Sequence, residues 1–127
     1  MAHIVVIEDN EDLRELVAAV LTRNGHAVRH TADAQEGVEL CRAAPTDVVI
    51  TDLCVPHGDA LSELLVRRRG ARCPVVILIT GLCDACRRYA GSVDAVLTKP
   101  FRMESLVGLV ARAAPRERRA RRRRTTT

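Results

Sequence analysis

Residues 48–58 read VVITDLCVPHG, an apolar run that ends at an aspartate and passes into a turn. All four residues of Val48–Thr51 are β-branched, which favours a strand, and an unbroken run of this kind is typical of a strand buried on both faces. Pro56 and Gly58 then mark a turn. The stretch therefore predicts a buried parallel strand with Asp52 at its carboxyl end.

Short apolar runs elsewhere alternate with amphipathic segments along the whole chain. The other apolar runs predicted as strands are Ile4–Ile7, Val75–Ile79 and Ala95–Leu97, and Ala27–His30, which follows Gly25 and is less apolar, supplies a fifth strand. The predicted helices are Glu11–Asn24, Ala34–Ala43, Asp59–Arg69, Asp84–Ala90 and Met103–Ala113. Strict alternation of this kind indicates a doubly wound α/β domain, a parallel sheet covered by helices on both faces. We expect one such domain over residues 1–114.

Composition agrees with a single globular domain. The chain has 127 residues, of which 47% are hydrophobic and 28% charged, unlike disordered or fibrous proteins. Nothing in it approaches the run of about 18 apolar residues that a membrane span needs, so we expect a cytoplasmic protein. The five cysteines are an odd number at low density, and we expect them to be reduced thiols.

The net charge of +4 comes from one segment. Arg116–Arg124 holds seven arginines and one glutamate, a local charge of +6, which leaves about −2 for the rest. We expect residues 115–127 to form a basic, disordered tail. No aromatic side chains lie between the arginines, so any nucleic-acid binding there should be weak and non-specific. A solvated tail without a partner is the simpler alternative.

Four of the predicted strands end in residues that can carry chemistry, and parallel strands place such ends at one edge of a sheet, where ligands bind. These residues are Glu8 and Asp9, Asp52, Thr80 and Gly81, and Lys99 and Pro100. Three neighbouring carboxylates need a compensating cation, and an all-oxygen set favours Mg²⁺. Lys99 offers a positive charge, and Thr80 a hydroxyl donor, to a phosphoryl group. The pattern predicts a phosphoryl-transfer site.

These motifs together resemble the receiver domains of two-component response regulators. The resemblance covers about residues 3–114 and joins the acidic pair, the DLCVPHG turn, Thr80-Gly81 and Lys99-Pro100-Phe101. It implies a flavodoxin-like (βα)5 three-layer sandwich with sheet order 2-1-3-4-5. A hydrolase of the haloacid dehalogenase type also uses an aspartyl phosphate, but it would want a second aspartate where Cys54 stands.

The resemblance also implies a role for each residue of the site. Asp52 would be the phosphoacceptor, and the Mg²⁺ ligands would be Glu8, Asp9, Asp52 and the backbone carbonyl of Cys54. The phosphate-binding and switch residues would be Thr80, Gly81 and Lys99. The peptide bond between Lys99 and Pro100 would be cis.

The implied function is a phosphorylation switch in signal transduction, without catalysis on any other substrate. Asp52 would take its phosphoryl group from a sensor histidine kinase or a histidine phosphotransfer protein, and the domain would relay the signal by contact with a downstream protein. No output domain follows, so we expect a single-domain regulator. The alternatives are a pseudo-receiver that is never phosphorylated and a receiver fragment of a larger regulator. The resemblance also implies a homodimer surface on helix 4, strand 5 and helix 5.

The sequence departs from the family in two places. Val96 replaces the usual aromatic residue on the fifth strand, and the segment between Thr80 and Lys99 is a few residues short, so we expect an altered signalling face. Cys83 and Cys86 form a C-x-x-C pair that is either a zinc or redox site or, more simply, two reduced thiols. Cys54 and Leu82 are poor positioners of water, which predicts slow self-dephosphorylation.

Overall fold

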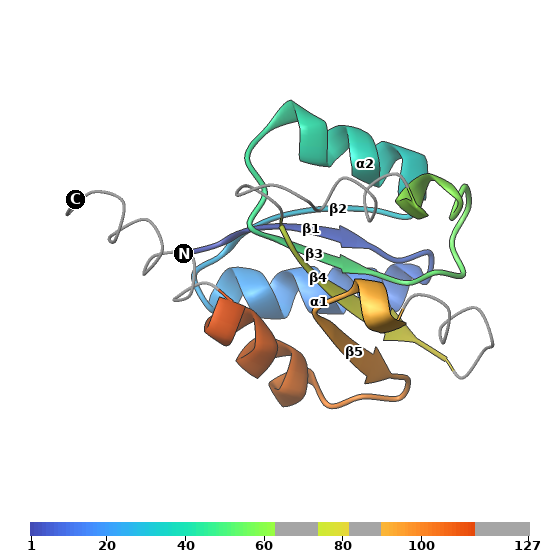
Figure 1. Cartoon of the computed structure of the whole chain (residues 1–127). Coiled ribbons are helices and arrows are strands. Elements are labelled where there is room, and N and C mark those ends of the chain that lie inside the picture. Colours follow the sequence, from blue (N-terminus) through green and yellow to red (C-terminus); the bar gives the residue numbers. More distant parts are fainter. Residues whose placement is uncertain (63–73, 82–89, 114–127) are drawn as a thin grey trace.

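Five parallel strands form the centre of the protein in the order β2-β1-β3-β4-β5 (Figure 1). The computed structural model describes residues 1–62, 74–81 and 90–113. The strands are β1 (His3–Ile7), β2 (Ala27–Thr31), β3 (Val48–Thr51), β4 (Val75–Thr80) and β5 (Ala95–Thr98). The predicted strand order is therefore confirmed, and each strand lies within one residue of its predicted bounds.

Helices cover both faces of this sheet (Figure 1). The helix α2 (Ala34–Ala43) lies on one face, and α1 (Glu11–Arg23) lies on the other with the helix at 103–113. This three-layer arrangement is the predicted flavodoxin-like fold. In the part of the chain that is described, no helix is long and apolar enough to cross a membrane.

The buried core divides into two clusters, one on each face of the sheet. Alternate side chains of β1 supply both, because successive residues of a strand point to opposite faces. Ile4 and Val6 pack in the cluster that contains residues of α1 and of the helix at 103–113. Val5 and Ile7 pack in the cluster that contains Ala34 of α2. Burying each such side chain contributes about 1.5–3 kcal/mol, so β1 is held firmly between the layers.

Both ends of α1 are defined by polar residues. At its start, Asn10 Oδ1 accepts a hydrogen bond from the Leu13 N–H at 3.0 Å, which satisfies a helix donor that would otherwise lack a partner. At its end, Asn24 is the C-cap and Gly25 takes a φ of 88°, a left-handed conformation that glycine adopts without steric cost. Because α1 begins directly after Asn10, Glu8 and Asp9 are confined to the short link between β1 and this helix.

Two helix predictions need correction at their ends. Asp59 lies in a turn, and the helix that follows begins at residue 60, because the Asp59 carbonyl accepts bonds from the Ser62 N–H and hydroxyl. Ala90 belongs to a 3-10 helix, η1 (Ala90–Ser92), and residues 93–94 connect this helix to β5. The other residues of these two predicted helices, 63–69 and 84–89, lie outside the described residues.

Candidate functional site

The predicted acidic residues meet at the carboxyl edge of the sheet. Ile7 at the end of β1 pairs with Thr51 at the end of β3, and the Asp52 N–H donates to the Ile7 carbonyl at 3.0 Å. This register sets Glu8 and Asp9 beside Asp52. One carboxylate oxygen from each of the three lies within 4.8 Å of the others.

Lys99 joins this group from the end of β5. Its Nζ donates to Asp52 Oδ2 at 2.6 Å and to the two oxygens of Glu8 at 2.9 and 3.1 Å. Its backbone N–H donates to the Thr80 carbonyl at 2.7 Å, which ties the lysine to the end of β4. The Lys99–Pro100 peptide bond is cis. One ammonium therefore bridges the carboxylates of Glu8 and Asp52, which lie 91 and 47 residues away from it in the sequence.

Burial sets the electrostatics of this bridge. Glu8 is fully buried. Its burial, together with the nearby charge of Asp52, raises the pKa of its carboxyl more than Lys99 and the Asn10 N–H lower it. For Lys99, burial acts to lower the pKa, but the hydrogen bonds to Asp52 and Glu8 and their charges outweigh it, and the net pKa is raised. Lys99 is therefore held in its charged form, whereas the ionised form of Glu8 is disfavoured.

Asp52 itself is almost completely buried, and both of its oxygens have partners. Oδ1 accepts a hydrogen bond from the Cys54 N–H at 2.9 Å, and Oδ2 accepts the one from Lys99. The side chain of Cys54 is exposed. Thr80 ends the neighbouring strand β4, and its hydroxyl donates to the Gly81 carbonyl at 2.9 Å. A Cβ at Gly81 would meet nothing within 4 Å.

The donor set fits a divalent cation of the Mg²⁺ type. Three carboxylates share the single positive charge of Lys99, and a divalent cation would supply the further positive charge that favours their ionised forms. The donors are all oxygen, as Mg²⁺ prefers. Asp9 is exposed, whereas Glu8 and Asp52 are buried, so the cluster is open to solvent on the side of Asp9.

Several contacts around the site were not predicted from the sequence. Arg14 donates through Nη1 to the Glu8 carbonyl at 3.2 Å and through Nε to His30 Nδ1 at 3.2 Å. His57 Nδ1 pairs with Asp33 Oδ2 at 2.5 Å, and this links the turn after Asp52 to the start of α2. Asp33 directly before a predicted helix was a readable capping signal. No local pattern in the sequence indicated the other partners.

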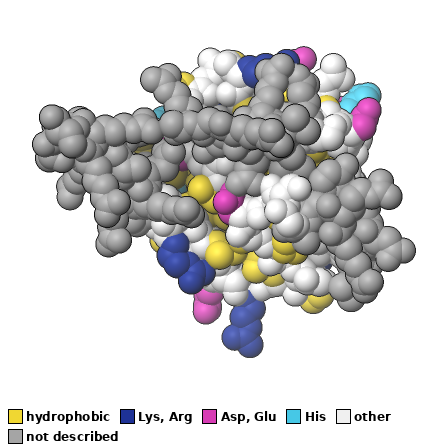
Figure 2. All heavy atoms as spheres, viewed as in Figure 1, with side chains coloured by type: hydrophobic (Ala, Val, Ile, Leu, Met, Phe, Trp, Pro, Cys, Tyr) yellow, Lys and Arg dark blue, Asp and Glu magenta, His cyan; other side chains and the backbone are white. Residues whose placement is uncertain are grey.

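Other predicted features lie apart from the site or outside the described residues. Val96 lies on β5 with 41% of its surface exposed. The described Lys and Arg side chains on the face in Figure 2 stand apart and form no basic patch there. Cys83, Cys86 and the tail with Arg116–Arg124 lie outside the described residues, so their predicted roles stay predictions.

Comparisons with known proteins agree with this geometry. The family model for the response regulator receiver domain matches residues 4–111. Among curated relatives, the virulence transcriptional regulatory protein PhoP of Salmonella choleraesuis is 33% identical over 112 residues, which cover 84% of this chain and 49% of that protein. The transcriptional regulatory protein TcrA of Mycobacterium tuberculosis is 31% identical over 106 residues, covering 81% of this chain and 42% of that protein. The chain thus spans about half the length of these relatives.

Solved structures show the same fold. The receiver domain of the Francisella response regulator 1452 superposes with a TM-score of 0.79 at 23% identity, covering 92% of this chain and 99% of that one. The response regulator TrrA of Thermotoga maritima, solved in complex with Mg(2+)-BeF, superposes with a TM-score of 0.76 at 23% identity, covering 89% of this chain and 99% of that one.

Proposed function

The chain belongs to the response regulator receiver family, and from this premise we propose that Asp52 accepts a phosphoryl group and thereby switches the domain between two signalling states. The observation that carries the proposal is the bond from Lys99 Nζ to Asp52 Oδ2 at 2.6 Å inside the acidic cluster. A buried carboxylate can act as the nucleophile that forms an aspartyl phosphate, and a fixed cation beside it can stabilise the charge of the phosphoryl group. The proposal applies equally to a stand-alone regulator and to the receiver part of a longer one.

The proposed reaction is an in-line transfer to an Asp52 oxygen. This oxygen attacks the phosphorus of a phosphohistidine or of a small acyl phosphate, a new P–O bond forms, and the bond to the leaving nitrogen or oxygen breaks with its electron pair. The Cys54 N–H orients the carboxylate through Oδ1. Lys99, already hydrogen-bonded to Asp52, follows the new charge by donating to a phosphoryl oxygen.

Glu8, Asp9, Asp52 and the backbone carbonyl of Cys54 would hold the Mg²⁺ ion in this proposal. The chemistry that the ion supplies when bound is neutralisation of the charge on the phosphoryl oxygens. The oxygen donors and the excess of three carboxylates over the single Lys99 ammonium support this choice. The complex of TrrA with Mg(2+)-BeF is a property of that protein and is consistent with the proposal.

Phosphorylation would change the conformation of residues near Asp52 that respond to the new negative charge, and a downstream protein would bind the changed surface. The Thr80 hydroxyl, which donates to the Gly81 carbonyl in this state, would turn toward the phosphoryl group and shift the adjoining strand. Val96 has no aromatic ring to follow this movement, so β5 itself would carry the change to a downstream protein. The phosphoryl donor would be a sensor histidine kinase or a histidine phosphotransfer protein. The covalent chemistry would be confined to Asp52, with no other substrate.

Intact-protein mass spectrometry after incubation with acetyl phosphate tests the proposal. The wild-type protein should gain the mass of one phosphoryl group with Mg²⁺ and none with a chelator, and the Asp52→Ala variant should gain none under either condition. The absence of any gain in the wild-type protein with Mg²⁺ would contradict the proposal and favour a pseudo-receiver that acts by binding alone.

A further inference from the structure

The turn that follows Asp52 is attached to α2 through two neighbouring contacts. The Pro56 carbonyl accepts a hydrogen bond from the Ala34 N–H at 3.0 Å. One residue later, His57 Nδ1 donates to Asp33 Oδ2 at 2.5 Å. The other oxygen of Asp33 caps α2 by accepting the N–H groups of Gln35 and Glu36 at 2.8 and 3.1 Å. One carboxylate therefore fixes the start of a helix and the turn beside it.

These contacts belong to a continuous series of bonds around the site. From Asp33, the series continues through its N–H to Thr31 Oγ1 at 3.2 Å, and the Thr31 carbonyl accepts the Glu8 N–H at 3.0 Å. On the other side, the turn returns through the Cys54 N–H to Asp52 Oδ1 at 2.9 Å, and Lys99 joins Asp52 to Glu8. The acidic cluster is thus bordered on the side of α2 by the pair formed by Asp33 and His57.

The backbone conformation at His57 indicates that the bond to Asp33 stabilises the turn itself. His57 has a φ of 58°, the left-handed region that residues other than glycine seldom adopt. The next residue must be small, because a Cβ at Gly58 would lie 2.7 Å from the Leu53 carbonyl oxygen. The turn is tight and conformationally costly at His57, and the bond to Asp33 offsets that cost in the conformation seen here.

We propose that Asp33 and His57 are positioning residues for the metal-binding edge of the site, and that their pairing holds the turn so that Cys54 keeps its place beside Asp52. This rests on the proposed function, since the Cys54 carbonyl is there a metal ligand. Neither side chain touches the acidic cluster, so both act through the backbone between residues 54 and 58.

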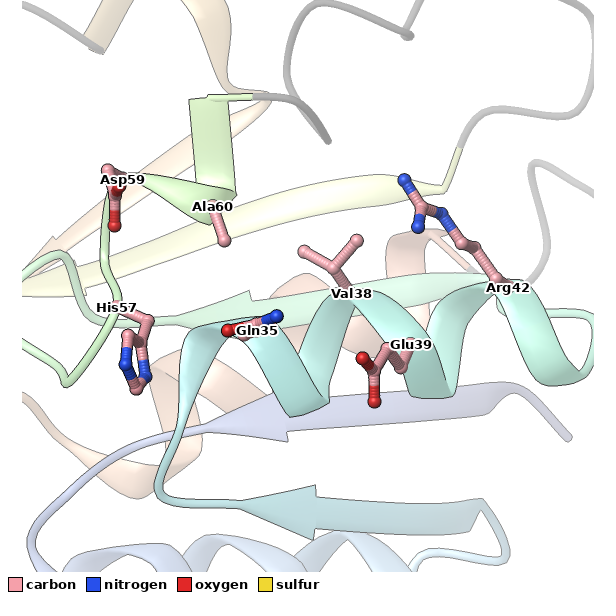
Figure 3. Close-up of a pocket in the computed structure, with 7 residues that line it drawn as sticks. All are labelled: Gln35, Val38, Glu39, Arg42, His57, Asp59 and Ala60. Carbon is pink, nitrogen blue, oxygen red and sulfur yellow. The ribbon is translucent and has the colours of Figure 1, made fainter.

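The surroundings of His57 leave this pairing open to protons from solvent. Its side chain is 63% exposed, and that of Asp33 is 29% exposed. Figure 3 shows the His57 ring beside the start of α2, at one end of a cavity of about 290 Å³ between α2 and residues 57–60. The charged groups that line this cavity with His57 are Glu39 and Arg42 of α2 and Asp59 of its own turn.

The hydrogen bond to Asp33 and its charge raise the pKa of His57, with a smaller contribution from the charge of Asp59. The hydrogen bond from His57, followed by helix N–H groups, lowers the pKa of Asp33. Asp33 is therefore ionised throughout the neutral range. The charged pairing is fully present below the ordinary pKa of histidine and is lost as pH rises through the raised pKa of His57.

Calorimetric titration with Mg²⁺ of the wild-type protein and of the His57→Gly and His57→Asn variants tests this inference. Glycine accepts the left-handed backbone and so relieves any strain, whereas asparagine accepts it and keeps a donor for Asp33. At about pH 6.5, His57→Gly should raise the Mg²⁺ Kd about two- to fivefold, the range for an exposed charged pair, and His57→Asn should recover part of the loss. The ratio of the His57→Gly Kd to the wild-type Kd should shrink toward about pH 9.

A second readout is amide hydrogen exchange followed by NMR in metal-free protein, in which the Cys54 N–H should exchange faster in His57→Gly than in the other two forms. Equal Mg²⁺ affinities for all three, or tighter binding by His57→Gly, would overturn the inference, because a purely local role would make glycine neutral or favourable. Wild-type protein that binds no Mg²⁺ would overturn both proposals. Wild-type protein that binds Mg²⁺ but takes no phosphoryl group would refute only the proposed function. The comparison of Mg²⁺ Kd values among the three proteins would still test the inference on Asp33 and His57.

Discussion

Lys99 and Glu8 lie 91 residues apart in sequence, yet Lys99 Nζ donates to both oxygens of the buried Glu8 carboxylate, at 2.9 and 3.1 Å. Lys99 thus neutralises part of the acidic cluster in the state described, as well as contacting the Asp52 oxygen. Phosphorylation would therefore draw this ammonium toward a new anion and weaken its contact with Glu8. In the proposed mechanism, this exchange would couple the proposed Mg²⁺ ligand Glu8 to phosphorylation of Asp52.

The first prediction concerns the surplus negative charge of the cluster. Asp9→Asn removes one of the three neighbouring carboxylates, so metal-free protein should become more stable, by about 1 kcal/mol, because like charges no longer repel. The same variant should lose most of the stabilisation that Mg²⁺ gives the wild-type protein. Thermal unfolding with and without Mg²⁺ measures both effects.

Asp12→Asn is the matched control, since Asp12 is an exposed aspartate in the first turn of α1 and is absent from the acidic cluster. It should keep the full response to Mg²⁺ and lose only a few tenths of a kcal/mol at the helix start. An Asp9→Asn variant that Mg²⁺ stabilises as much as it does the wild type would exclude Asp9 as a ligand.

The second prediction uses the raised pKa of Glu8. A carboxyl whose pKa is higher in the folded than in the unfolded protein binds protons more readily when folded. Its contribution to stability is therefore greatest below about pH 4.3, the ordinary value for glutamate, and is lost as pH rises through the raised pKa. In a chelator, the free energy of unfolding of the wild type should fall relative to Glu8→Gln as pH rises through this window. Urea unfolding at a series of pH values measures the difference, and parallel curves would show that Glu8 does not titrate there.

The third prediction contrasts two glycines. A Cβ at Gly58 would lie 2.7 and 3.2 Å from the carbonyl oxygens of Leu53 and Val55, whereas one at Gly108, within the helix at 103–113, would meet nothing within 4 Å. Gly58→Ala should cost about 1–3 kcal/mol, since backbone must move. Gly108→Ala should add about 0.5–1 kcal/mol through helix propensity. Chemical denaturation of both variants checks the signs, and a Gly58→Ala protein as stable as the wild type would show that the turn yields freely.

The fourth prediction concerns the lifetime of the phosphoryl group. Cys54 lies two residues after Asp52 with an exposed side chain, and a thiol orients an attacking water poorly. We expect the phosphorylated protein to persist for minutes or longer after acetyl phosphate is removed, and Cys54→Asn to shorten that lifetime several-fold, with Cys54→Ala as the control. Mass spectra taken over time provide the measurement, and loss within seconds in the wild type would refute this expectation.

The sequence was sufficient for the fold class because most of the strands carry their own signal. Val48–Thr51 and the other apolar runs are short and bounded by turns, and they alternate with amphipathic segments, whereas the strand order followed from the family resemblance. Their carboxyl ends then bring Glu8, Asp9, Asp52 and Lys99 together without any knowledge of packing, since all parallel strands end at one edge.

The sequence did not predict which side chains would form hydrogen bonds with one another at that edge of the sheet. Lys99 was predicted as a charge partner of the phosphoryl group, but its bonds to Glu8 were not predicted, because they depend on side-chain positions that no spacing encodes. The pair formed by Asp33 and His57 joins two loops 24 residues apart, and it requires a left-handed backbone at a histidine, which local propensity disfavours. The ends of two predicted helices also differ, since Asp59 lies in a turn and Ala90 in a 3-10 helix, and helix ends are the least certain part of such a prediction.

The most direct test of the central claim is to locate the phosphoryl group itself. Protein incubated with acetyl phosphate and Mg²⁺ is reduced with borohydride, which converts an aspartyl phosphate to homoserine, and is then sequenced by tandem mass spectrometry. Our account predicts homoserine at position 52 and at no other aspartate, and none when Mg²⁺ is withheld. Homoserine at Asp9 or at another carboxylate, or its absence from the Mg²⁺ sample, would contradict the assignment of Asp52 as the phosphoacceptor.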